Sequence, residues 1–264
     1  MYDYDGFFEL VRRYQPNATI FQDAGPDIRW IGNEAGKPRA SEWAVVPSEL
    51  TRFAQKQTDG ALVEGDLSGI YNTWDGLGDL ATIQYSKGLC FCPAEVDMSI
   101  RPGWFYHPEE EPHSLERLFH TYLSSVGNNA TFHLNIPPMP DGRFDPRDVE
   151  RLAQLGAALR EAFSAPVEAA QTLERVSDTQ CIYHIDVPAG QNVRYVLLEE
   201  DIAQGQRVEH FILTRIGSFG NTEVFYEGTT VGRRRICPVE ASGRFDVRIT
   251  SARDEVKNLR VTLY

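Results

Sequence analysis

Residues 93–107 read PAEVDMSIRPGWFYH and decide how the first half of the chain is interpreted. From Val96 to Ile100, apolar and polar side chains alternate, which is typical of a β-strand with one apolar and one polar face. The Arg101-Pro102-Gly103 turn ends this strand, and an aromatic cluster follows it. Parallel α/β proteins place their chemistry where strands end, so this stretch predicts an α/β unit with a site at the strand's carboxyl end.

The flanking segments predict the same class of fold. Apolar side chains recur at helical spacing in three segments, and a Pro-Pro turn closes one apolar strand. The predicted elements are a helix over 7–14, a short buried strand over 18–22, a helix over 115–126, a strand over 130–136 and a helix from Asp145 to Phe163. The order helix, strand, loop, strand, helix, strand, helix favours a parallel barrel or a doubly wound sheet.

A different pattern begins after about Pro166. Short alternating runs separated by turn residues predict an all-β second part, and about seven such strands are typical of a β-sandwich. We therefore expect two domains, residues 1–166 and 167–264. The predicted strands are 179–187, 195–200, 206–214, 223–230, 233–239, 243–250 and 259–264.

The segment over residues 58–88 is rich in glycine. We predict a long loop over residues 58–88, interrupted by one short strand at Ala81–Tyr85. Long loops inside compact domains are often functional.

Composition excludes several classes of protein. The chain has 264 residues and a net charge of −12, which argues against a nucleic-acid surface and against docking on anionic lipid. No apolar run is long enough to span a membrane, and the acidic N-terminal segment lacks the features of a signal peptide, which would have to lie upstream of Met1.

The four cysteines, at 90, 92, 181 and 237, do not form a metal-binding pattern. Free buried thiols explain them better. We expect neither a metal nor a cofactor.

Polar residues that could carry chemistry concentrate in the loop after the first predicted strand. This position is where barrel enzymes place catalytic groups. The same side chains could instead cap turns, with Arg29 paired to a carboxylate. The candidates are Asp23, Asp27, Arg29, Trp30, Asn33 and Glu34.

A second group lies on the strand quoted first. Glu95, Asp97 and Ser99 share one face, and Arg101 follows them. Because buried, unpaired polar groups are costly, these side chains should line a wet cavity or form a network with the arginine. A binding role and a structural role both fit.

The aromatic run Trp104–His107 follows directly. Its rings could stack on the C–H faces of a sugar or could plug the core under the loop. Carboxylates, an arginine and aromatic rings together suit glycoside hydrolysis, in which one carboxylic acid protonates the leaving oxygen and another carboxylate acts as nucleophile or base.

Four segments together resemble the α-L-fucosidases of glycoside hydrolase family 29. They run in the family's order through residues 5–165, and later strands, including IAQGQRVEHFIL and GTTVGRRRICP, resemble that family's C-terminal β-sandwich. GNEAG and EW-VVP are similar to the branch that acts on α-1,3/4-linked fucose. The four segments are LVRRYQPNATIFQDAGPDIRWIGNEAG (10–36), SEWAVVP (41–47), PAEVDMSIRPGWFYHPEEE (93–111) and SLERLFHTYLSSVGNNATFHLNIPP (114–138).

The resemblance implies a retaining enzyme that needs no metal or cofactor and that removes terminal fucose from an oligosaccharide or glycoconjugate. By motif, Glu34 is the acid/base, and Glu95 is its rival. The implied location is extracellular, periplasmic or lysosome-like. The implied pocket residues are Arg29, Trp104 and Phe105. Further candidates, either in the pocket or directly behind the residues that line it, are Asp27, Trp43, Asp97, Arg101 and His107.

The resemblance also implies that part of the barrel is missing. The family's nucleophilic aspartate lies upstream of the helix that opens this chain, and Asp3 and Asp5 are not at a strand end. We therefore expect the C-terminal half of a (β/α)8-like barrel followed by a β-sandwich, inactive without the nucleophile. The alternative is a non-catalytic fucose- or glycan-binding protein derived from a fucosidase.

Overall fold

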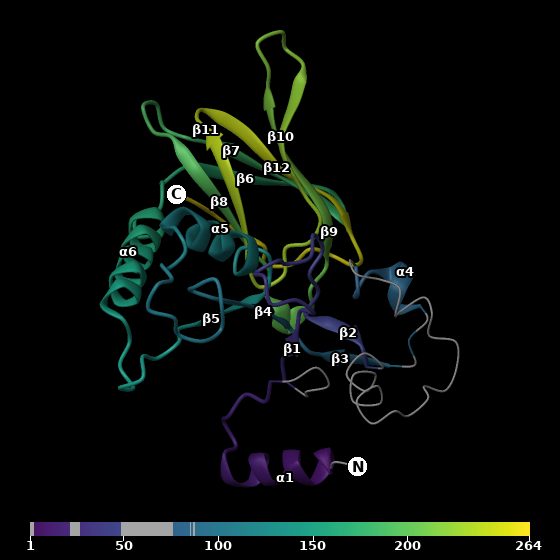
Figure 1. Ribbon diagram of the computed structural model, residues 1–264. Coiled ribbons are helices and arrows are strands. Elements are labelled where there is room, and N and C mark those ends of the chain that lie inside the picture. The colour runs from purple at the N-terminus through teal and green to yellow at the C-terminus, as the bar shows by residue number, and fades with distance from the viewer. Residues whose placement is uncertain (1–2, 22–26, 49–75, 85, 87) are drawn as a thin grey trace.

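The computed structural model describes residues 3–21, 27–48, 76–84, 86 and 88–264. Figure 1 shows two regions: a β-rich region formed by the C-terminal strands, and an α/β region that contains the N-terminal helix and a small parallel sheet. Within the described ranges no helix is long and apolar enough to cross a membrane. None of the four cysteines forms a disulfide.

A parallel sheet forms the centre of the α/β region. It contains β1 (Arg29–Trp30), β4 (Ala94–Ser99) and β5 (Thr131–Asn135), in the order β1-β4-β5. Two helices follow its strands: α5 (Leu115–Ser125) connects β4 to β5, and α6 (Pro146–Phe163) follows β5. The expected α/β order is therefore present, as an open three-stranded sheet rather than a closed barrel among the described residues.

Local signals account for both helices. The Ser114 side chain accepts a hydrogen bond from the Arg117 amide (3.2 Å), and the Asp145 carboxylate accepts one from the Arg147 amide (2.9 Å). These N-caps satisfy amides that the first helical turn leaves free. The apolar faces of α5 and α6 then pack on the apolar face of β4, in a core cluster of Met98, Ile100, Leu118 and Leu155.

Two expected strands are wrong or much reduced. Residues 80–83 form a short helix, α4 (Leu80–Ile83), where a strand over 81–85 was expected; the β-branched residues there have no neighbouring strand to pair with among the described residues. Of the strand expected over 18–22, residues 18–21 are described, and they form only one parallel bridge, between Phe21 and Ile28. Most of the predicted 58–88 loop, residues 58–75, 85 and 87, lies outside the described residues.

A second, two-stranded sheet pairs β2 (Val45–Pro47) with β3 (Leu89–Phe91) in antiparallel fashion. Val46 of β2 and Cys92, which follows β3, are buried in one apolar cluster with Leu77.

The C-terminal region is the expected β-sandwich, with one strand more than predicted. A five-stranded sheet of order β10-β9-β12-β7-β6 lies against a three-stranded sheet of order β11-β8-β13. The additional strand is β6, whose eight residues are all exposed and so lack the alternation of a half-buried strand. The strands are β6 (Ala170–Ser177), β7 (Gln180–Asp186), β8 (Val193–Glu199), β9 (Val208–Ile216), β10 (Thr222–Gly228), β11 (Arg235–Ala241), β12 (Arg244–Ala252) and β13 (Arg260–Leu263), with a 3-10 turn at Ile202–Gln204.

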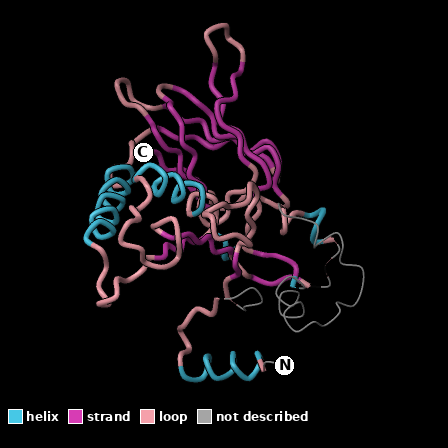
Figure 2. The backbone as a smooth tube through the Cα atoms, viewed as in Figure 1, coloured by secondary structure: helices cyan, strands magenta, loops and turns pink. Residues whose placement is uncertain are grey.

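The N-terminal helix α1 (Tyr4–Tyr14) packs on little of the described structure. Asp3 caps it by accepting a hydrogen bond from the Gly6 amide (2.9 Å), yet none of its residues is buried. Phe7 is 56% exposed although it belongs to the helix's apolar face. Figure 2 shows the helix joined to the remaining structure by an extended loop.

Candidate functional site

The polar face of the parallel sheet is the candidate site. Because side chains alternate along a strand, Glu95, Asp97 and Ser99 of β4 share a face with His133 and Asn135 of β5. His133 Nδ1 lies 2.9 Å from Glu95 Oε1, and Asn135 Nδ2 donates to Ser99 Oγ at 3.1 Å. The five side chains thus form a continuous polar surface across two strands.

Glu95 is the most deeply buried carboxylate of this face, at 2% exposed. Burial, helped by the nearby charge of Asp97, raises its pKa to about 7, while His133 acts in the opposite direction. Its second oxygen has no hydrogen-bond partner among the described residues. Glu95 therefore has the proton affinity of a general acid, but it lies at the amino end of β4.

Asp97 links this face to the loop that follows β1. Trp30 Nε1 donates to Asp97 Oδ1 at 3.2 Å, and the Gly36 amide donates to the Asp97 carbonyl at 2.9 Å. Burial raises the pKa of Asp97, and the negative charge of Glu34 raises it further. The Glu34 carboxylate is therefore close enough for its charge to act on Asp97.

Glu34 is exposed and lies beyond the carboxyl end of β1. The Asn33 side chain shapes its loop by accepting from the amides of Ala35 (3.1 Å) and Lys37 (3.2 Å). Gly36 has φ +70°, and a Cβ there would lie 3.1 Å from the Met98 sulfur, so this turn requires glycine. The loop holds Glu34 at the edge of the polar face, open to solvent.

Arg29 and Trp43 were expected in the pocket, but both side chains are enclosed. Arg29 forms an ion pair with Glu42, and both side chains are at most 5% exposed. The ring of Trp43 is covered by the Arg253 guanidinium, whose carbon lies 3.5 Å from the ring centroid. The indole Nε1 of Trp43 donates a hydrogen bond to Asp79. Arg29 is thus paired with a carboxylate, which was its alternative interpretation, and Trp43 packs between the two regions.

Asp27 also has a structural partner. It accepts from the Ile20 amide at 2.6 Å and pairs with Arg12, whose guanidinium holds the pKa of this carboxyl below its usual range. The ion pair joins α1 to the residues just before β1, and the hydrogen bond from Ile20 joins the segment after α1 to the same residues.

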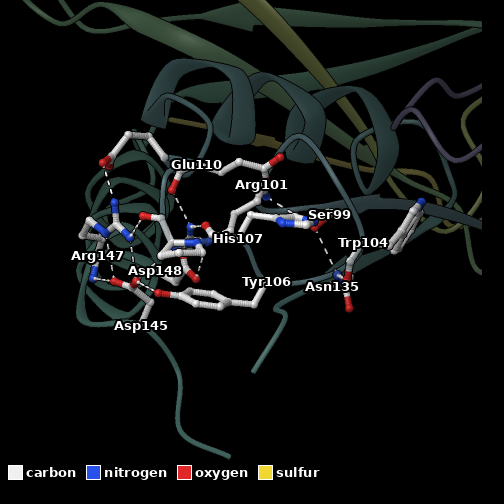
Figure 3. A network of polar contacts seen from close by, with 12 residues as sticks. Ser99, Arg101, Trp104, Tyr106, His107, Glu110, Asn135, Asp145, Arg147 and Asp148 are labelled. Carbon is white, nitrogen blue, oxygen red and sulfur yellow. Dashed lines mark hydrogen bonds and ion pairs between the residues drawn. The ribbon is translucent and has the colours of Figure 1, made fainter. Parts of the chain in front are cut away.

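The aromatic loop after β4 carries the most exposed ring of the site. Phe105 is 81% exposed, Trp104 is half-buried, and the His107 side chain is 55% exposed. Arg101 is enclosed, because it is 1% exposed and turns toward α6 (Figure 3). It supports the loop and does not line its open side.

Sequence reasoning overlooked His133 and the role of Trp30. His133 was placed inside a strand and given no role, yet it pairs directly with Glu95. The alternation of Thr131, His133 and Asn135 was the available signal, since it matches the alternation of β4. Among the described residues, no group of three histidine, cysteine or acidic side chains is arranged to hold a metal.

The site thus offers an exposed carboxylate, a buried carboxyl with raised pKa and an exposed aromatic ring. A carboxylic acid beside a carboxylate can protonate a leaving oxygen and then activate water, and an exposed ring can pack on a sugar's C–H face.

Comparisons with known proteins agree with this chemistry. The α-L-fucosidase family profile matches residues 3–162. The chain is 31% identical to α-L-fucosidase 1 of Arabidopsis thaliana and 28% identical to a putative α-L-fucosidase 1 of Oryza sativa subsp. japonica, in each case over 89% of this chain. It spans about half of these relatives, 48% and 47% of their length.

Solved structures show the same likeness. A crystal structure of SpGH29 matches with a TM-score of 0.80 and 28% identity, over 100% of this chain and 59% of that one. A putative α-L-fucosidase from Bacteroides ovatus matches with a TM-score of 0.80 and 30% identity, over 100% of this chain and 45% of that one. On these matches, the chain belongs to the α-L-fucosidases of glycoside hydrolase family 29.

Proposed function

We propose that this chain carries the acid/base half of a retaining α-L-fucosidase site that removes terminal α-linked L-fucose, with a preference for α-1,3/4 linkages. The observation that supports it most is the position of Glu34. It lies at the carboxyl end of a parallel strand, beside Asp97 and on the same side as the aromatic loop, where α/β enzymes assemble their sites. The substrate is a fucosylated oligosaccharide or glycoconjugate, and the site of action is extracellular or lysosome-like.

Glu34 is the better acid/base than Glu95. Glu95 has the raised pKa that a general acid needs, but its carboxyl is enclosed and paired with His133 at the amino end of β4. A general acid must reach the leaving oxygen directly or through one water. Glu34 is exposed and lies beyond the carboxyl end of β1, so its carboxylate is open to a bound sugar.

The nucleophile is proposed to come from a segment outside residues 1–264. Asp3 caps α1, and Asp27 is held by Arg12 and the Ile20 amide, so neither is free to attack. Asp97 takes its hydrogen bond from Trp30 and has a raised pKa, which suits a residue that shapes the site rather than an ionised nucleophile.

The experiment combines turnover and binding. Purified 1–264 is assayed with an aryl α-L-fucoside, and L-fucose binding is measured by calorimetry for the unmodified chain, Glu34→Gln and Phe105→Ala. We expect L-fucose binding without turnover, little change in Glu34→Gln and about tenfold weaker binding in Phe105→Ala, because the ring contributes contact with the sugar.

Three outcomes would change this proposal. Turnover that Glu34→Gln removes would retain the fucosidase and show that the nucleophile lies within the chain. Turnover removed by Glu95→Gln alone would transfer the acid/base role to Glu95. Absence of both turnover and L-fucose binding would contradict the proposed function.

A second candidate function is that of a non-catalytic protein that binds fucosylated glycans. It is favoured because Phe105 is exposed while no nucleophile is assigned among the residues of this chain. The discriminating measurement is mass spectrometry of a fucosylated oligosaccharide after long incubation with the longest natural form of the protein. Release of fucose excludes the binding protein, and tight binding of an intact glycan supports it.

A further inference from the structure

Arg101 is a fully charged side chain in one of the least exposed positions of the α/β region. Its Nε lies 3.0 and 2.9 Å from the two carboxylate oxygens of Asp148, and its Nη2 lies 3.1 Å from Asp145 Oδ2. Arg101 and Asp148 have side chains that are 0% exposed. Enclosed ion pairs are costly to form and are retained where their geometry is needed, so this one requires an explanation beyond stability.

The same guanidinium holds the backbone of the loop after β4. Arg101 Nη1 donates to the carbonyls of His107 (3.0 Å) and Glu110, and its carbon lies 5.0 Å from the centroid of the Tyr106 ring. The Tyr106 hydroxyl in turn lies 3.1 Å from Asp145 Oδ2. Figure 3 shows these contacts converging on Arg101 from the loop and from α6.

Two further contacts hold the loop from outside. Asn135 Nδ2 donates to the Trp104 carbonyl at 3.1 Å, which ties the loop to β5. Arg147 donates to the Pro108 carbonyl at 3.0 Å while pairing with Asp145. Carbonyls on both sides of Phe105 are therefore fixed by β5, by α6 and by Arg101.

The backbone around Phe105 is held by several hydrogen bonds, whereas the Phe105 ring itself is exposed. Phe105 is 81% exposed and sits between the fixed carbonyls of Trp104 and His107. An exposed aromatic side chain costs stability without a partner, and a pre-ordered backbone lowers the entropy lost when a ligand binds to it. The combination is expected for a ligand contact whose supporting residues fix its position.

We propose that Arg101, Asp145 and Asp148 are positioning residues, which hold the Arg101–His113 segment so that Trp104 and Phe105 meet the apolar face of a bound sugar. The inference rests on the proposed function for the identity of that sugar, L-fucose. The positions of the carbonyls and of the ion pair support the positioning role itself. Arg101 acts through the loop and does not touch the sugar.

The test uses Asp148→Asn in the full chain, which removes one charge and keeps the side chain's shape. Hydrogen exchange is followed for the amides of 103–110, L-fucose affinity by calorimetry and Tm by circular dichroism. We expect exchange in 103–110 to rise about tenfold or more, and L-fucose binding to weaken about tenfold, with exchange in the β-sandwich unchanged. Asp141→Asn is the matched control, since it removes an exposed carboxylate paired with Arg143 between β5 and α6.

A second variant, Tyr106→Phe, guards against misfolding of Asp148→Asn. It removes only the hydroxyl that reaches Asp145, so we expect smaller changes in the same direction, in exchange and in affinity. If amide exchange in 103–110 is unchanged in both variants, the inference that Arg101 holds this segment in place is wrong. Faster exchange with unchanged L-fucose affinity would overturn the positioning role. If the unmodified chain binds no L-fucose, the proposed function and the proposed contact between the aromatic rings and the sugar are both wrong. The exchange measurement then still shows whether Arg101 holds the loop in place.

Discussion

The β-sandwich and the parallel sheet differ in the size of the apolar core that each of them buries. Twenty buried apolar residues form one continuous core between the two sheets of the sandwich, whereas the largest buried cluster against the parallel sheet has four among the described residues. The second face of the parallel sheet carries carboxylates and a histidine instead. The sandwich is thus built around one large apolar core, and the parallel sheet has one apolar face and one polar face.

The contrast teaches that the largest apolar core and the polar face of the parallel sheet lie in different regions of this chain. A buried carboxyl such as Glu95 costs folding free energy, because its charge is poorly solvated. The region that carries such groups needs a stable neighbour, and Trp43 under Arg253 is one of the contacts by which the sandwich supports it. Four substitutions test this separation.

The largest effect is expected for Phe211→Ala. Phe211 is fully buried in β9, and its ring stacks on Tyr226 with centroids 6.0 Å apart. Truncation leaves a cavity and should lower the free energy of unfolding by about 3–5 kcal/mol. Urea unfolding followed by far-UV circular dichroism measures it, since most strands lie in the sandwich.

Tryptophan fluorescence provides a separate report in the same experiment. All four tryptophans, at 30, 43, 74 and 104, lie in the N-terminal region. If the regions are separable, the fluorescence midpoint moves less than the dichroism midpoint. If the fluorescence and dichroism midpoints coincide in the unmodified chain and also in Phe211→Ala, the two regions unfold as one cooperative unit, which would contradict the separation.

The next effect is the pH dependence that Glu95 contributes. Its pKa is about 7 in the folded chain and 4.5 ordinarily, so between these values the folded chain holds more protons than the unfolded chain. Stability should therefore fall as pH rises from about 4.5 to about 7, by no more than about 3 kcal/mol, and level off above.

Glu95→Gln should remove this fall, because the amide does not titrate. Urea unfolding followed by tryptophan fluorescence at pH 5 and pH 8 measures the difference, with exposed Glu168→Gln as the control. An equal pH dependence in Glu95→Gln and the unmodified chain would show that Glu95 is not the titrating group.

A smaller effect is expected at the junction of the regions. The Ile236 amide donates to the Gly127 carbonyl at 2.8 Å, and a methyl group on Gly127 would lie 2.7 Å from Ile236 Cβ and 2.1 Å from the Leu123 carbonyl oxygen. Gly127→Ala should cost about 1–3 kcal/mol through crowding.

Gly156→Ala is the matched control for this substitution. Gly156 lies inside α6, and a methyl group there meets only the flexible end of Arg160, at 3.4 Å. Alanine in a helix should raise stability by about 0.5–1 kcal/mol. Thermal unfolding compares the two, and the same sign for both would refute a tight junction at Gly127.

The smallest effect is expected for Phe7→Ala in α1. The ring is 56% exposed, and alanine is a better helix former than phenylalanine, so stability should change by less than about 0.5 kcal/mol. Chemical unfolding measures it beside Phe211→Ala. A loss above about 1 kcal/mol would mean that the ring is buried in solution.

Elements with strong local signals could be predicted from the sequence. The helices over 115–125 and 146–163 have side-chain caps at Ser114 and Asp145, together with apolar stripes. The strands expected over 18–22 and 81–85 were mispredicted. A run of so few residues fits a helix and a strand equally well, and only the presence or absence of a neighbouring strand decides between them. The boundary between residues 166 and 167 stays a prediction.

For the site, the sequence motifs were sufficient for the family and for the polar face of β4, because alternation along a strand is local. They could not distinguish enclosed side chains from open ones. Arg101 finds Asp148, Arg29 finds Glu42, and Trp43 lies under Arg253, in each case through residues distant in the chain. Burial and ion pairing depend on contacts that only the tertiary structure forms, so only the structure separated the enclosed side chains from the exposed ones.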